Sequence, residues 1–187
     1  MNLKTYMGEV ERTLSVSKDT NKALTLTALG LAGETGEVVE LIKRIVCHDK
    51  DIDVSKLVLE MGDVLWYLTA MCLVLNVDMD AVVDEVERTL SVSEDTNKAL
   101  TLTALGLAGE TGEVVELVKK IVFHDKDIDV SKLVLEIGDV LWYLTAMCLV
   151  INVDMEQVVD ANVAKLRSRH PKGWTTEYSS TTDQTAS

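Results

Sequence analysis

The sequence predicts an all-α protein made of two copies of one helical unit, and three observations support this prediction. The 187-residue chain is 47% hydrophobic, which is enough to bury a sizeable core. It contains a single proline, Pro171, and is rich in Leu, Val, Ala, Glu and Lys, a composition that favours helices. Residues 9–84 also recur almost unchanged as residues 85–160.

The repeat has an offset of 76 residues, and its two copies differ at eight positions. The differing pairs are Lys18/Glu94, Ile42/Val118, Arg44/Lys120, Cys47/Phe123, Met61/Ile137, Leu75/Ile151, Asp80/Glu156 and Ala81/Gln157. Such near-identity indicates a recent duplication or a deliberate fusion. Two copies of a helical hairpin suffice for a four-helix core, so we expect four-helix-bundle packing and a single chain that mimics a dimer.

The spacing of apolar residues predicts the helices of each copy. A short amphipathic first helix is indicated by residues that share one face: Leu3, Tyr6, Met7, Val10 and Leu14. A second helix is expected over about residues 21–47. A third is expected from an N-cap at Asp53 to about residue 75, and Asp78 is expected to cap a fourth.

The two copies are joined by a sequence that does not resemble a flexible linker. Residues 79–90 lack Gly, Pro and Ser, and their apolar residues keep helical spacing across the boundary. We therefore expect one continuous helix to join the copies. The expected domains are a first unit over residues 1–84 and a second unit, with a closing C-terminal segment, over residues 85–174. The Ser/Thr-rich residues 175–187 are expected to form a disordered tail.

Each copy contains four acidic residues whose spacing suits one shared site. Glu34 and Glu37 lie three residues apart on the second helix, and Glu60 and Asp63 are spaced in the same way on the third. Antiparallel packing would bring these four carboxylates together, where they repel one another. Oxygen-rich clusters of this kind fit hard cations, so we expect Mg²⁺ or Mn²⁺. The equivalent acids of the second copy are Glu110, Glu113, Glu136 and Asp139.

The most apolar stretch, residues 57–75, is long enough to suggest a membrane span. Its two acids, Glu60 and Asp63, would each cost a few kcal/mol in lipid, so we expect a buried helix and no membrane. A buried carboxylate needs a partner. The nearby bases that could pair with these acids, though fewer than the acids, are Lys43, Arg44 and Lys56. Gly36 and Gly62, between the paired acids, indicate either close helix packing or room for a ligand.

Three sequence strings in order resemble the MazG-like all-α nucleoside triphosphate pyrophosphohydrolases: GLAGETGEVVE, LEMGDVLWYL and the closing ANVAKLRSRHPKGW. The resemblance extends over nearly all of residues 2–174. It implies hydrolysis of a (deoxy)nucleoside triphosphate to the monophosphate and pyrophosphate, in house-cleaning of the nucleotide pool. It also implies that the eight acids of the two copies hold Mg²⁺ and act in catalysis. A metal would bridge phosphate oxygens and activate a water, and one of the same glutamates could serve as the base.

The same resemblance implies substrate contacts. Tyr67 and Tyr143 follow the metal-binding aspartates by one turn and could line a nucleoside pocket, although a core position is an equal alternative. The closing segment contributes three residues that would meet the phosphates or lie on a solvated face: Asn162, Lys165 and Arg169. The first copy has Val86, Thr89 and Ser93 at the equivalent positions. Its activity should therefore depend on the C-terminal arm or on another chain.

The composition argues against some classes of binding partner and predicts where in the cell the protein is found. A net charge of −13 argues against nucleic acid or an anionic membrane as a partner, since both need a basic face. Three cysteines without a CxxC pair, and an N-terminus without an apolar run, predict a cytoplasmic protein. We expect a homodimer of two-unit chains. Two alternatives to general triphosphate hydrolysis are a phosphoribosyl-ATP pyrophosphatase and a non-catalytic helical scaffold whose acids bind metal only for structure.

Overall fold

The computed structural model describes residues 3–15, 17–79, 95–124 and 126–173. These residues form six helices and no strand. The first unit contains α1 (Leu3–Thr13), α2 (Thr20–His48) and α3 (Val54–Leu75). The second contains α5 (Thr96–Phe123), α6 (Val130–Val150) and α7 (Met155–Arg169). The predicted all-α class is therefore confirmed.

Local capping explains where the helices begin and end. The Asp19 side chain accepts hydrogen bonds from the backbone N–H groups of Asn21 and Lys22 at the start of α2. Asp53 accepts one from the N–H of Lys56, which confirms the predicted cap of α3. The helix ends at Asn76, whose φ of 57° is a left-handed conformation that asparagine tolerates better than most residues. α7 begins where the Gln157 side chain accepts a hydrogen bond from the N–H of Asp154.

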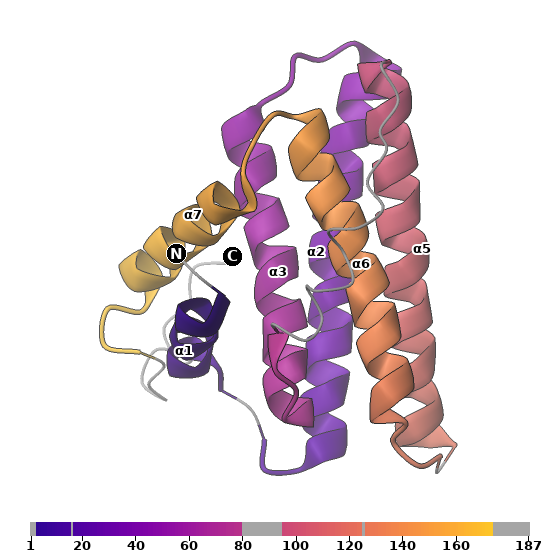
Figure 1. Cartoon of the computed structure of the whole chain (residues 1–187), viewed down its shortest axis with the longest axis vertical. Helices are drawn as coiled ribbons and strands as arrows, with labels where there is room; N and C mark the ends of the chain where they lie inside the picture. Colours follow the sequence, from indigo (N-terminus) through magenta and orange to yellow (C-terminus); the bar gives the residue numbers. More distant parts are fainter. Residues whose placement is uncertain (1–2, 16, 80–94, 125, 174–187) are drawn as a thin grey trace, which may run out of the picture.

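Four long helices form a bundle, and two shorter helices pack on one side of it (Figure 1). The α2–α3 hairpin packs against the α5–α6 hairpin, mainly through α2 and α5. α1 and α7 lie beside each other against α3. The equivalent residues Thr35 and Thr111 meet in the buried α2–α5 contact, with their hydroxyl oxygens 3.1 Å apart. Contact between equivalent residues is the mark of a two-fold relation, so the chain is a pseudo-dimer.

The core is one continuous cluster of buried apolar side chains drawn from both units. Two of its helices, α3 and α6, are long and apolar enough to cross a membrane by length and composition alone. Both pack within the bundle, and burial accounts for the apolar residues that face the core. The expected continuous helix over 79–90 and the expected disordered tail over 175–187 fall almost wholly outside the described residues.

Candidate metal and nucleotide site

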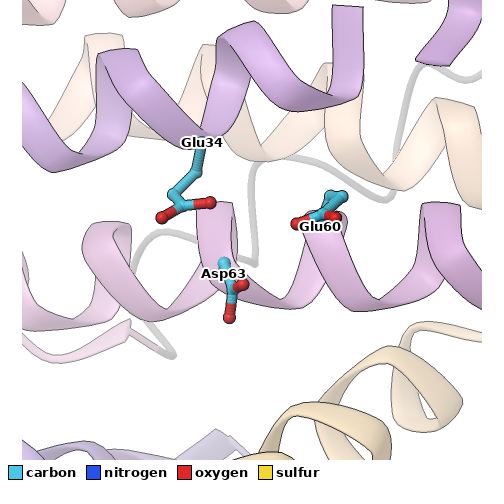
Figure 2. A group of neighbouring side chains, drawn as sticks. All are labelled: Glu34, Glu60 and Asp63. Atoms are coloured by element: carbon cyan, nitrogen blue, oxygen red, sulfur yellow. The ribbon is translucent and has the colours of Figure 1, made fainter. Parts of the chain in front are cut away.

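Three of the four predicted acids of the first unit converge. Glu34 on α2 faces Glu60 and Asp63 on α3, and one carboxylate oxygen from each lies within 4.8 Å of the others (Figure 2). Glu37, one turn further along α2, is exposed and outside this trio. In the second unit Glu110, Glu136 and Asp139 form an equivalent trio, and Glu113 is exposed. We call these groups the first and second acid clusters.

The first acid cluster is closed by the C-terminal helix. The side-chain amide of Asn162 donates to Asp63 Oδ1 at 3.0 Å, and the Lys165 ammonium pairs with Asp63 Oδ2. The partner of Asp63 is therefore Lys165, and the candidate bases Lys43 and Arg44 pair with Glu40 instead.

The sequence places this segment in the second unit, which it follows in the chain. In the structure α7 packs on α3 and α1 of the first unit.

A hydrogen bond that the sequence did not suggest fixes the Asn162 amide. The Tyr6 hydroxyl on α1 donates to Asn162 Oδ1 at 2.8 Å, and both side chains are fully buried. Because the amide oxygen accepts from Tyr6, the amide nitrogen is directed at Asp63. Tyr6 had been interpreted only as part of an apolar helix face. Its buried hydroxyl, which requires a partner, was the signal that could have identified it.

The glycines between the paired acids have different surroundings. A Cβ at Gly62 would come within 2.9 Å of the Asn162 Cβ, so this glycine allows α7 to approach α3 closely. A Cβ at Gly36 would meet nothing within 4 Å. Close packing therefore explains Gly62, whereas Gly36 borders open space.

A pocket of about 190 Å³ adjoins the first acid cluster. It is lined by side chains from α1, α2, α3 and the end of α7: Thr13, Glu34, Asp63, Trp66, Tyr67, Leu166, Arg169 and His170. The Trp66 indole donates to the Thr13 hydroxyl at 3.1 Å, and the Trp66 and Tyr67 rings meet edge to face. The predicted contacts Tyr67 and Arg169 thus both line one pocket beside the acids. This volume is below the roughly 300 Å³ of whole-ligand pockets, so it suits part of a nucleotide.

Tyr67 is held against the backbone of α2 at Gly30. A Cβ at that glycine would lie 2.0 Å from the Tyr67 ring, and Gly106 has the same relation to Tyr143. We expect Gly30→Ala to displace the ring and to lower the free energy of unfolding by about 1–3 kcal/mol. Gly33→Ala, where a Cβ meets nothing within 4 Å, should instead stabilise by up to about 1 kcal/mol. Urea unfolding of both variants tests this, and equal effects would contradict it.

Burial and neighbouring negative charges change the pKa of Glu34 in the first acid cluster. The pKa of Glu34 is raised above its ordinary 4.5, first by burial and then by the Asp63 carboxylate, while Lys165 partly offsets the rise. Ionisation of Glu34 is therefore less favourable in the folded protein than in the unfolded chain. A divalent cation among the three carboxylates would remove this penalty, and their oxygens are ligands that Mg²⁺ and Mn²⁺ accept.

Without metal, Glu34→Gln should be more stable than the unsubstituted chain near pH 8. A raised folded-state pKa means that the ionised form destabilises the fold above that pKa, and glutamine carries no such charge. As the pH falls through the raised pKa towards 4.5, Glu34 takes up a proton and the difference should shrink. Urea unfolding in EDTA across this range measures it. A stability gap that widens on acidification would contradict this interpretation.

Comparison with known proteins agrees with this geometry. The family model described as the MazG nucleotide pyrophosphohydrolase domain matches residues 22–91 and again residues 98–174. The chain belongs to the MazG family. Both MazG matches include an acid cluster, and the second also includes α7. This family assignment and the tandem arrangement confirm the interpretation of the sequence.

A curated relative also aligns with part of the chain. The Gene 37 protein of Mycobacterium phage L5 is 36% identical over 84 residues, which span 42% of this chain and 73% of that protein. No solved structure gives a significant match. MazG proteins are typically dependent on a divalent metal, and both acid clusters offer the carboxylate oxygens that such a cation needs.

Proposed function

We propose that this MazG protein is a Mg²⁺-dependent nucleoside triphosphate pyrophosphohydrolase, with Mn²⁺ as a substitute metal. Its products would be a (deoxy)nucleoside monophosphate and pyrophosphate, in house-cleaning of the nucleotide pool. The observation that carries this proposal is the first acid cluster, which adjoins both a basic helix face and an aromatic-lined pocket. Such a reaction requires carboxylates for a metal, cations for phosphates and aromatic rings for a nucleoside.

Each part has a distinct role in the proposed reaction. Glu34, Glu60 and Asp63 would hold the metal, which neutralises phosphate charge and activates a water. Lys165 pairs with Asp63 beside these acids, where its ammonium would also be placed to meet a phosphate oxygen. Arg169 lies in the same pocket wall and supplies a second cation.

The remaining groups serve the nucleoside and the attacking water. Trp66 and Tyr67 line the pocket and offer ring surfaces to the nucleoside. Glu37 lies one turn from the first acid cluster, where it could be a fourth metal ligand or the base for the water. The cytoplasmic location and the pairing of two chains stay predictions.

A nucleotide panel assayed for pyrophosphate tests the proposal. The purified chain is incubated with common ribonucleoside and deoxyribonucleoside triphosphates, and with phosphoribosyl-ATP, at millimolar Mg²⁺ or Mn²⁺. We expect pyrophosphate from at least one triphosphate and none in EDTA. Preference for phosphoribosyl-ATP would favour the alternative enzyme. Absence of pyrophosphate from every nucleotide would favour the non-catalytic scaffold.

A further inference from the structure

The two acid clusters have the same acids but different surroundings. α2 and α5 are nearly identical in sequence, as are α3 and α6, so differences between the clusters come from what packs against them. α1, near the N-terminus, and α7, near the C-terminus, both pack on α3. Within the described residues, neither of them packs comparably on α6.

Equivalent residues on α3 and α6 differ in how exposed they are. Asp63 is half-buried under α7, whereas its counterpart Asp139 is exposed. Leu59 on α3 is 37% exposed and its counterpart Leu135 on α6 is 64% exposed. The second acid cluster therefore lies on a more open face in the described part of the chain.

The two acid clusters also differ in the charged groups around them. The Lys165 ammonium pairs with Asp63 in the first acid cluster. Among the described residues, no ion pair joins a cation to Glu110, Glu136 or Asp139. A triphosphate is strongly anionic, so a cluster with a built-in ammonium would hold it better than one of carboxylates alone.

We infer that the substrate is bound and hydrolysed at the first acid cluster alone, in a centre completed by both ends of the chain, with Tyr6 as a positioning residue. This inference rests on the proposed function and adds which of the two units hydrolyses the substrate. The second acid cluster, although it has the same acids, does not support comparable turnover. The duplication therefore gives one complete centre per chain, in which α7, which begins in the second repeat and ends beyond it, closes the first unit.

Tyr6 acts through Asn162. Its hydroxyl fixes the amide so that the nitrogen donates to Asp63, and the sequence has valine, which has no hydroxyl, at the aligned position 82. A partner that orients a metal-binding carboxylate typically contributes 10–100-fold to activity or metal affinity. Tyr6 does not itself line the pocket, and its hydroxyl donates to Asn162, so its effect should appear in turnover through Asn162.

A matched pair of variants tests which unit works. Glu60→Gln and Glu136→Gln make the same chemical change at equivalent positions, and steady-state pyrophosphate release is compared for each single variant. We expect the loss caused by Glu60→Gln to exceed that caused by Glu136→Gln by at least about 50-fold. Equal losses, or a larger loss from Glu136→Gln, would overturn the inference. An unsubstituted chain without activity would refute the proposed function instead, so the two failures are distinguishable.

A double-mutant cycle tests the positioning role of Tyr6. We expect Tyr6→Phe to lower kcat by about 10-fold with less effect on KM, in protein that thermal unfolding shows to be folded at the assay temperature. In an Asn162→Ala background the same change should have little further effect, because the two residues act as one unit. No loss of kcat from Tyr6→Phe, or losses that multiply in the double variant, would overturn the positioning role.

Discussion

Replacing Glu60 and Glu136 together with glutamine should abolish pyrophosphate release while the helices stay folded. Each substitution removes one carboxylate from an acid cluster whose oxygens lie within 4.8 Å of one another. Changes to residues that merely support metal ligands typically cost 10–100-fold, so loss of a ligand in both clusters should cost more than about 100-fold. Pyrophosphate release measures the loss, and circular dichroism checks the helices.

Stability provides the control for this double variant. Without metal, the three carboxylates of each cluster repel one another, so removing one should leave the melting temperature unchanged or raise it. Added Mg²⁺ should raise the melting temperature of the unsubstituted chain more than that of the variant, because binding stabilises the state that binds. A folded double variant that retains activity would rule out the assigned metal site.

Lys165→Met should lower kcat/KM by about 100-fold. The Lys165 side chain is 16% exposed, and methionine would remove the ammonium that meets a phosphate oxygen in the proposed reaction. Loss of one member of a hydrogen-bonded charge pair typically costs a few kcal/mol, and each 1.4 kcal/mol corresponds to a factor of ten. Steady-state kinetics with the best triphosphate from the panel measures the change.

A neighbouring cation on the same helix provides the matched control. Arg167 pairs with Glu9 at the surface, where its side chain is 59% exposed, and such pairs contribute little. Arg167→Met should therefore change kcat/KM by less than about twofold, and Lys165→Arg should recover part of the loss. If Lys165→Met and Arg167→Met had equal effects, Lys165 would have no special role in the site.

The fold could be predicted from local patterns because they reflect local physics. Asp53 was identified as a cap from its place before an apolar run, and its side chain does accept the Lys56 N–H. The predicted α2, over about residues 21–47, agrees with the observed Thr20–His48 within one residue at each end. The repeat predicted the pseudo-dimer, which the Thr35–Thr111 contact between its halves confirms.

The sequence predicts which acids share one helix face, but not which distant residues complete the site. Spacing placed Glu60 and Asp63 side by side, but no pattern within α7 shows which unit it covers. Asn162 reaches Asp63 across 99 positions of sequence, and that choice depends on the shape of the whole bundle. Tyr6 was missed for a related reason: helical periodicity predicts that a tyrosine is buried, but not which distant group its hydroxyl meets.

Product analysis tests the central claim most directly. The chain is incubated with its best triphosphate and Mg²⁺, and the nucleotide and phosphate products are separated and quantified over time. A pyrophosphohydrolase should release the nucleoside monophosphate and pyrophosphate in equal amounts from the first time point, and release should stop when EDTA removes the metal. Formation of the diphosphate and inorganic phosphate, or release that continues in EDTA, would contradict it.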